Sequence, residues 1–478
     1  MNVRLLLIVL NCLAFTFVGA QSYKINVRIK GYTNDTLLLG YHYGDKQYIK
    51  DTAFSKTGEF TFEGDTLLDA GMYLVVIKPS HDYFQLLLDK DKQQFSIQTN
   101  ILNLNEELTF KGSKLNQDFM DYVSFISNRK IQADSLGGII KTAVDESLNK
   151  KLKERLNVLD LEVDQKQKDI LKNQAGSMLS LVLKWSKDIE IPEFKGTKEE
   201  IEDQSFDFYK KHYFDYADFS DDRSVGIPLF HQKIDRYVQK LTVQMPDSIS
   251  AALDYLLSKC TEGSKVFQYI VSNYLNVYAN SKYVGMDGVY VHLVEKYYGQ
   301  GKTPWVDEEN LAKMVLDAKT LKPLLIDKIA PDIRMYYKDN TPIRLHDVRS
   351  PYTVLVFWAP DCGHCKQSMP KLVEFYKNYK SKGVEIFAVC SKLAKDESTC
   401  WEALDTLQMG EWINVTDKEH YSRFRLIYDI KTTPQVYILD ENKRILTKKI
   451  AFEQLGEVMD KLIQYKLNET ANYRTGAK

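Results

Sequence analysis

The chain has 478 residues, 44% of them hydrophobic and 27% charged, and a formal net charge of −1 at pH 7. This length fits about three domains of ordinary size, and the composition is typical of a soluble globular protein. The balanced charge gives no electrostatic basis for binding nucleic acid or anionic lipid, so we expect neither as a partner.

The first 20 residues are predicted to be a signal peptide rather than part of the fold. Arg4 supplies a positive charge, two short apolar runs follow, and Val18-Gly19-Ala20 is a small-residue cleavage site before Gln21. Cys12 follows Asn11, where a lipoprotein signal needs a small residue, so we expect no lipid anchor. No later stretch reaches the ~18 consecutive apolar residues of a membrane span.

Export predicts a compartment in which disulfides can form. The bacterial cell envelope, in particular the periplasm, is favoured because the last residues do not form a retention signal of the Lys-Asp-Glu-Leu type. Glycosylation sequons at Asn34, Asn414 and Asn468 leave a eukaryotic secretory origin as the alternative. The few cysteines beyond the signal peptide do not suffice for a fold that depends on disulfides.

Residues 21–111 are predicted to form an all-β sandwich. Ile25, Val27 and Ile29 alternate with polar residues, which is the pattern of a half-buried strand. Met72–Ile77 and Phe84–Leu88 are denser apolar runs that read as further strands. About seven short strands separated by turn residues indicate a small antiparallel sandwich.

Residues 112–324 are predicted to form an all-α domain. One apolar helical face consists of Leu148, Leu152, Leu156, Leu159 and Val163. Further helices are predicted over residues 169–187, 197–214, 228–244, 246–259, 264–280 and 289–298. We expect about six to eight helices and no sheet in this region. Cys260, alone near a helix end, is interpreted as a small packing residue.

Residues 325–478 are predicted to form an α/β domain that carries the chemistry. Val354–Trp358 is a short apolar run typical of a buried strand, and residues 366–379 have helical spacing. Cys362 and Cys365 lie at the junction between the predicted strand and the predicted helix. Because unfilled N–H groups at a helix start favour negative charge, this is a suitable place for a reactive thiolate.

The two cysteines are expected to have different roles. Cys362 would be the exposed nucleophile, and Cys365, one turn inside the helix, the buried thiol that resolves the mixed disulfide. His364 lies between them and would stabilise the thiolate. We therefore predict a redox-active pair.

Other readings of the cysteines are weaker. A zinc site would need two further ligands at suitable spacing, and a purely structural bridge is the other alternative; we expect neither a metal nor another cofactor. A peroxidatic site would need a different spacing from Pro360 to Cys362. Cys390 and Cys400 flank a loop after the predicted strand at 384–390, and we expect two separate reduced thiols there, with a second bridge as the alternative.

The segment WAPDCGHCK resembles the WAPWCGHCK site of protein disulfide isomerases, and residues 325–467 resemble the TlpA/ResA-like envelope thioredoxins. Ala330-Pro331-Asp332 matches the lead-in of that family, and Thr433–Asp440 matches its cis-proline strand. The resemblance implies a thioredoxin-like fold in which a cis Pro434 faces the cysteine pair and Thr433 pairs with substrate backbone. Trp358 and Gly363 are expected to contribute to substrate binding.

The chain departs from these families at two positions. Asp361 replaces the tryptophan of the isomerases, and its charge beside Cys362 should oppose formation of the thiolate. Val356 stands where thioredoxin carries a buried acid that helps proton transfer. The glutamate that some TlpA-like reductases hold near the next strand end is not transferable, because Lys392 and Lys395 intervene.

We conclude from the sequence that this is an exported thiol-disulfide oxidoreductase with two accessory domains, a plan that resembles Bacteroidetes envelope thioredoxins. The resemblance implies protein disulfide or dithiol substrates, a membrane-bound electron donor and action as a reductase, with a role in cytochrome c maturation. The alternatives are an oxidase or isomerase, as the Cys-Gly-His-Cys motif suggests, and a partner-binding adaptor in which redox activity is subordinate.

Overall fold

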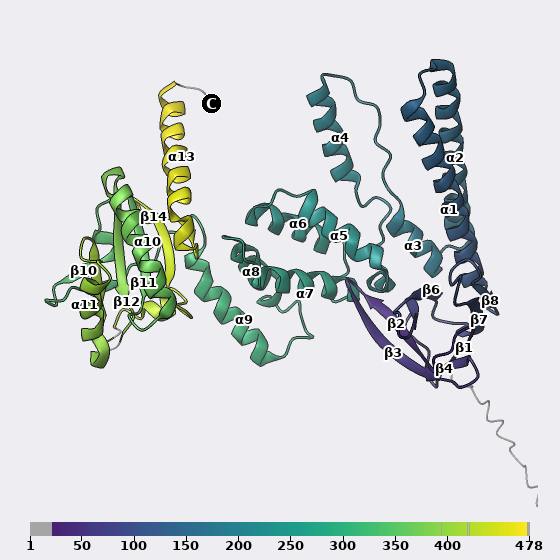
Figure 1. Ribbon diagram of the computed structural model, residues 1–478, viewed down its shortest axis with the longest axis horizontal. Helices are drawn as coiled ribbons and strands as arrows, with labels where there is room; N and C mark the ends of the chain where they lie inside the picture. Colours follow the sequence, from purple (N-terminus) through teal and green to yellow (C-terminus); the bar gives the residue numbers. More distant parts are fainter. Residues whose placement is uncertain (1–21, 393, 418, 420, 476–478) are drawn as a thin grey trace, which may run out of the picture. The chain divides into compact units, whose positions relative to one another are not determined.

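The computed structural model describes residues 22–475 apart from 393, 418 and 420, so the predicted signal peptide and Cys12 lie outside the described residues. The chain divides into two compact units, Met1–Tyr237 and Val238–Lys478. In the described part of the chain, no helix is both long and apolar enough to cross a membrane. The predicted multidomain fold, with β, helical and thioredoxin-like parts in that order, is confirmed (Figure 1).

The first unit begins with two four-stranded sheets that pack face to face. Their strand orders are β4-β1-β7-β8 and β3-β2-β5-β6. The bounds are β1 Tyr23–Lys30, β2 Thr36–Tyr43, β3 Lys46–Phe54, β4 Glu59–Gly64, β5 Gly71–Ile77, β6 Tyr83–Leu88, β7 Gln94–Asn100 and β8 Thr109–Lys111. The predicted alternation holds, since Ile25 and Val27 of β1 share a buried core with Leu39 of β2. The sandwich is not purely antiparallel, because β1 pairs with β7 in parallel.

Strand β6 lies at the edge of its sheet, and a side chain occupies part of that edge. The carboxamide of Asn116 accepts a hydrogen bond from the Leu87 N–H at 2.7 Å and donates one to the Leu87 carbonyl at 2.9 Å. Asn116 is fully buried, so these bonds are shielded from water. The amide thereby provides the two groups that a neighbouring strand would offer at this position.

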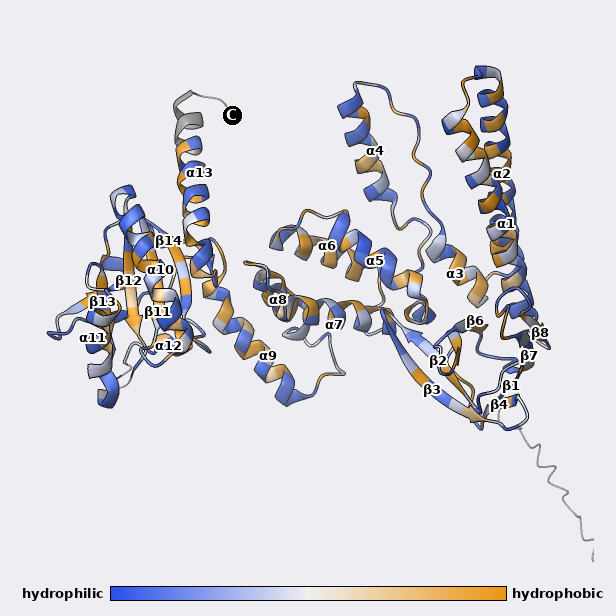
Figure 2. Ribbon diagram, in the orientation of Figure 1, coloured by the Kyte–Doolittle hydropathy of each residue, from blue (hydrophilic) through white to orange (hydrophobic). Residues whose placement is uncertain are grey.

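The first unit has five helices among the described residues, and the first of them was not predicted. They are α1 Lys114–Thr142, α2 Glu146–Asn173, α3 Met178–Ser186, α4 Lys198–His212 and α5 Pro228–Lys240, the last of which crosses the boundary between the units. Both α1 and α2 mix apolar and polar residues along their whole length (Figure 2). The single helix predicted over residues 169–187 is wrong, because Gly176 takes a φ of +86° and the Ser177 side chain caps a new helix.

The second unit starts with a small helical layer. It contains α6 Pro246–Ser258, α7 Lys265–Ala279, α8 Asp287–Leu293 and α9 Glu308–Leu321, with a π-helical turn at Val294–Tyr298. The buried face of α7 includes Phe267, Val271 and Tyr274, as its apolar stripe predicted. This layer leads into the α/β domain through a 3-10 turn at Lys322–Leu324.

The α/β domain is built on a seven-stranded sheet with the order β10-β9-β13-β12-β11-β14-β15. The strands are β9 Arg334–Tyr336, β10 Pro342–Arg344, β11 Tyr352–Trp358, β12 Val384–Cys390, β13 Ile413–Thr416, β14 Gln435–Asp440 and β15 Ile445–Lys448. The helices are α10 Gly363–Tyr379, α11 Glu397–Thr406, α12 Phe424–Ile427 and α13 Leu455–Thr475. Figure 1 shows α10 running alongside β11 and β12.

Strand β11 is the centre of this domain, and all of its residues are buried. Val354 and Val356 face a core shared with α10, α11 and α13, whereas Leu355 and Phe357 face a second core that contains Phe424 of α12. Each face of the sheet is therefore covered, which explains why the run was continuously apolar rather than alternating.

The sequence from 418 to 428 also predicts a helix, and this prediction is only partly confirmed among the described residues. The Asp417 carboxylate accepts hydrogen bonds from the backbone N–H groups of Tyr421 and Ser422, and neither of these two residues is helical. Arg423 then takes a left-handed φ of +52°, and only Phe424–Ile427 is helical. The local hydrogen bonds of an aspartate compete with helix formation here.

A buried ion pair connects the helical layer to the sheet within the second unit. Lys448 of β15 contacts the Asp287 carboxylate at the start of α8 and donates a hydrogen bond to the carbonyl of Leu324. The Lys448 side chain is 3% exposed and that of Asp287 22% exposed. Burial lowers the pKa of Lys448, and Asp287 acts against this shift by favouring the ammonium. Asp287 therefore stabilises the charged form of Lys448.

Substituting Asp287→Asn should destabilise the second unit by about 3 kcal/mol, because it leaves a buried ammonium without its counter-ion. Lys448→Met should cost less, since the remaining carboxylate reaches water. Urea unfolding followed by tryptophan fluorescence measures both. The control is Glu295→Gln, which breaks the exposed pair with Lys322 and should cost under about 1 kcal/mol. Equal losses for Asp287→Asn and Glu295→Gln would contradict the assigned role of the buried pair.

Candidate functional site

The cysteine pair lies at the carboxyl end of the buried strand β11, where α10 begins. Cys362 is the N-cap residue of α10, and its Sγ accepts a hydrogen bond from the Cys365 N–H at 3.3 Å. Cys362 is half-buried, whereas Cys365 is fully buried, and both are free thiols. The structure therefore places one thiol at the surface and the other directly behind it.

The loop before β14 forms the other side of the site. The Thr433–Pro434 peptide bond is cis, as the family resemblance implied. The Cys362 thiol donates to the Thr433 carbonyl at 3.2 Å, so the two segments are in direct contact although 71 residues separate them. Thr433 and Pro434 are both partly exposed. This contact places Cys362 against Thr433, which directly precedes Pro434.

The two thiols differ in acidity. Burial raises the pKa of Cys362, but hydrogen bonds from Cys365 and Thr433 and from the backbone of Cys365 and His364 outweigh it, and the pKa falls below its ordinary value. Burial and the bond with Cys362 raise the pKa of Cys365 to about 12. The half-buried Cys362 thiol is thus the one that ionises more readily, and only a thiolate attacks a disulfide.

The remaining predicted residues lie in different surroundings. Gly363 and His364 are exposed on the first turn of α10. Trp358 is 1% exposed, and its indole N–H makes no hydrogen bond with any residue that the structure describes. Val356 is fully buried in the core, where it supplies no proton acceptor. Of these side chains, only His364 is open to solvent beside the pair.

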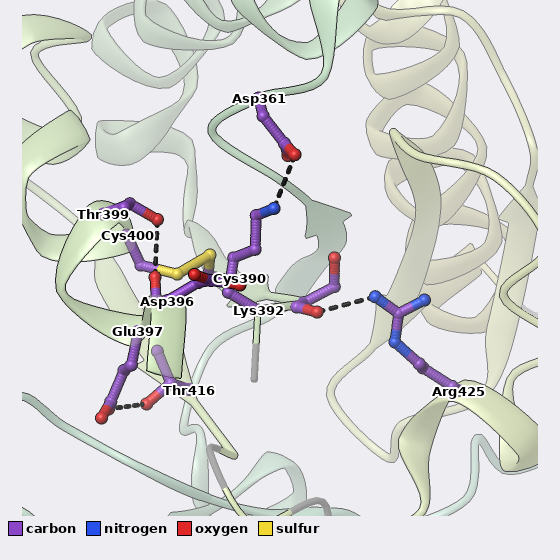
Figure 3. The surroundings of a disulfide bond; sticks show 10 residues. Asp361, Cys390, Lys392, Asp396, Glu397, Thr399, Cys400, Thr416 and Arg425 are labelled. Atoms are coloured by element: carbon purple, nitrogen blue, oxygen red, sulfur yellow. Dashed lines mark hydrogen bonds and ion pairs between the residues drawn. A yellow bond between two sulfur atoms is a disulfide. The ribbon is translucent and has the colours of Figure 1, made fainter. Parts of the chain in front are cut away.

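The prediction of two separate thiols at Cys390 and Cys400 is wrong, because these residues form a disulfide with a Cα–Cα distance of 6.2 Å. Helix α11 folds back toward the end of β12 and brings Cys400 to Cys390, with both residues buried (Figure 3). Spacing of ten residues along the chain could not reveal this return. The distance lies within the ordinary range for disulfides.

Sequence reasoning also missed the partner of Asp361. Lys392, two residues beyond Cys390, makes an ion pair with the Asp361 carboxylate at 2.6 Å (Figure 3). The hydrogen bond from Lys392 lowers the pKa of Asp361, against a small effect of burial. Because 31 residues separate Lys392 from Asp361, the sequence alone could not identify this ion pair.

No cluster of three or more potential metal ligands occurs among the described residues 22–475. In particular, Cys362 and Cys365 are not joined there by the two further ligands that a tetrahedral zinc site requires.

Three families match consecutive parts of the chain. Residues 23–119 and 162–320 match domains of unknown function, DUF4369 and DUF5106, and residues 326–461 match the Redoxin family. The thiol-disulfide oxidoreductase ResA of Bacillus cereus is 38% identical over 140 residues, which are 29% of this chain and 77% of that protein. The chain belongs to the ResA-like family of thiol-disulfide oxidoreductases.

A further relative and two solved structures are similar to parts of the chain. ResA of Oceanobacillus iheyensis is 43% identical over 51 residues, so this match spans 11% of the chain and only 27% of that relative. Among solved structures, a domain of a possible thiol-disulfide isomerase from Cytophaga hutchinsonii is 37% identical over 31% of this chain and 98% of its own length, with a TM-score of 0.28. A thioredoxin-like protein from Bacteroides caccae is 20% identical and covers 57% of this chain and 98% of its own, with a TM-score of 0.43.

Alkylation should distinguish the two thiols of this ResA-like site. At pH 7 iodoacetamide should modify Cys362 at least about tenfold faster than Cys365, because Cys362 has the lower pKa and is partly exposed, whereas Cys365 is buried. As the pH rises, the rate at Cys362 should increase with a midpoint below the ~8.5 of an ordinary cysteine. Peptide mass spectrometry measures each site, and the half-exposed Cys260 serves as an internal reference. Equal rates at Cys362 and Cys365 would contradict the assignment.

Proposed function

We propose that this protein exchanges disulfides with exported proteins through Cys362 and Cys365, and that it acts as a reductase. The observation that carries the proposal is the contrast between the two thiols. Cys362 ionises readily at the start of α10, while Cys365 is buried behind it with a strongly raised pKa. Such a pair suits an enzyme that attacks with one sulfur and releases its substrate with the other.

In the first step, the Cys362 thiolate attacks one sulfur of the substrate disulfide. A mixed disulfide forms, and the first substrate sulfur leaves as a thiolate. In the second step, the Cys365 sulfur attacks Cys362, forms the Cys362–Cys365 disulfide and expels the second substrate thiolate, which takes up the Cys365 proton. The substrate gains two electrons, and the enzyme must then be reduced by a donor, which we propose to be a membrane-bound dithiol protein.

Neighbouring groups support this sequence of steps. The Thr433 carbonyl lies 3.2 Å from the attacking sulfur, so a substrate segment beside Pro434 can pair with this backbone while its disulfide meets Cys362. Gly363 carries no side chain over the first turn of α10, which leaves the sulfur approachable, and His364 can stabilise the thiolate. Trp358 is buried in the same core as Cys365.

We propose the cell envelope, outside the cytoplasm, as the place of action. Disulfides persist in oxidising compartments, and this chain has a buried bridge between Cys390 and Cys400. The predicted signal peptide agrees with export. The reducing direction rests on the resemblance to TlpA/ResA-like thioredoxins, which extends the proposed substrates to oxidised cysteine pairs such as those of apocytochrome c.

The Cys365→Ala variant should accumulate mixed disulfides with its substrates, because nothing then resolves the first adduct. The adducts should be visible as thiol-sensitive high-mass bands after acid quenching and alkylation. The matched control is Cys260→Ala, which removes a thiol far from the pair in sequence and should trap nothing. If Cys362→Ala retains its partners non-covalently while Cys365→Ala traps none, the protein is an adaptor rather than an oxidoreductase.

The reduction potential of the Cys362–Cys365 couple should lie near the −270 mV typical of thioredoxin. Equilibration with defined glutathione or dithiothreitol buffers, followed by alkylation and mass analysis, measures it. A value near the −180 mV typical of disulfide isomerases, or above it, would contradict the reducing direction and favour oxidase or isomerase activity.

A further inference from the structure

The loop that follows β12 is held directly beside the redox pair. Strands β11 and β12 run parallel, and their register places Cys390 opposite Trp358, four residues before Cys362. Beyond this point the Ser391 N–H donates to the Trp358 carbonyl at 2.9 Å. The Arg425 guanidinium binds the Ser391 carbonyl at 2.7 Å. The first residues after β12 are therefore fixed by backbone contacts on both sides.

The Cys390–Cys400 disulfide closes this loop at its base. Both cysteines are almost fully buried, with 2% and 1% of their surface exposed. Helix α11, which carries Cys400, is also attached to β13, because the Thr416 hydroxyl donates to the Glu397 carboxylate at 2.6 Å. The disulfide thus joins the end of β12 directly to α11.

The Lys392 side chain points from this loop toward Asp361 in the turn between β11 and α10, here called the redox turn (Figure 3). Its ammonium meets the Asp361 carboxylate at 2.6 Å, and its side chain is 22% exposed while that of Asp361 is 69% exposed. The lysine is therefore the better-held half of the pair. Asp361 immediately precedes Cys362, so a carboxylate released from Lys392 could approach the sulfur and oppose its ionisation.

We propose that Lys392 is a positioning residue for the Cys362 thiolate: it holds the Asp361 carboxylate in a neutral ion pair, and the Cys390–Cys400 bridge holds Lys392 in place. This inference rests on the proposed role of Cys362 as nucleophile. The other groups facing the turn are His364, Lys366 and Cys365 on α10 and the Thr433 carbonyl before β14. All of these groups lie on α10 or in the loop that precedes Pro434. Among the groups named here, Lys392 alone comes from the loop after β12.

The bridge itself is not proposed as a second redox couple. Cys390 and Cys400 are too deeply buried to meet a substrate disulfide. The disulfide restricts the movement of the loop and so keeps the Lys392 ammonium close to Asp361.

The test compares the pKa of Cys362 in matched variants, measured from the pH dependence of alkylation at that residue. Lys392→Gln should raise the pKa by about half a unit, as expected for the loss of a partly exposed ion pair. Lys395→Gln removes the same charge from an exposed position in the same loop and should leave the pKa unchanged. A rise of equal size in both variants, or no rise in Lys392→Gln, overturns the proposal.

Repeating the measurement in the Asp361→Asn variant shows whether Lys392 acts by holding the Asp361 carboxylate or by attracting the Cys362 thiolate directly. If Lys392 acts by holding the carboxylate, Lys392→Gln should change the pKa of Cys362 clearly less in that background. An equal rise with and without Asp361 would mean that the ammonium acts directly on the thiolate, and the positioning role would be wrong. Because Asp361 and Lys392 both lie at the surface or near it, these variants should fold.

The bridge is tested by the double variant Cys390→Ser with Cys400→Ser. It should raise the pKa of Cys362 to the same extent as Lys392→Gln, and adding Lys392→Gln to it should have no further effect. An unchanged pKa overturns the role of the bridge. If Cys362 forms no mixed disulfide even in wild-type protein, the proposed function fails as a whole; if it does and the pKa is insensitive to Lys392, only this inference fails.

Discussion

The redox site depends on the central position of β11, which has a parallel neighbour on one side and an antiparallel neighbour on the other. Because β12 runs parallel, it ends at the same edge of the sheet as β11 and delivers Cys390 and Lys392 there. Because β14 runs antiparallel, it starts at that edge, directly after Pro434. Two segments remote in sequence thereby meet Cys362 from opposite sides, and neither needs a long loop to reach it.

Electrostatically, the site meets two opposing requirements. Ionised Cys362 reacts faster, and the N–H of Cys365 at the helix start favours that form. A thiolate that is too stable, however, makes the corresponding disulfide a stronger oxidant, which works against a reductase. Asp361 acts in the opposite direction to the helix, and Lys392 limits its effect. The reduction potential of the Cys362–Cys365 couple thus depends on several modest electrostatic contributions. The Gly363-His364 dipeptide between the cysteines does not set it alone.

Elements with a strong local signal could be predicted from sequence, whereas features that depend on chain return could not. The apolar run before Cys362 and the alternation in β1 were sufficient to identify strands. Helix α1 was missed because Gly137-Gly138 and scattered polar residues obscure its period, and it buries little. Three features depend on which distant segments come together: the Cys390–Cys400 bridge, the Lys392–Asp361 pair and the buried Lys448. The spacing of residues along the chain does not indicate these contacts.

The amide of Asn116 has a consequence for pairing with other chains. An exposed strand edge can recruit extended segments of other chains. With α1 in place, Leu87 at the edge of β6 already has both its hydrogen-bonding partners. The helix that follows the sandwich therefore closes this position of the edge to pairing with a second chain.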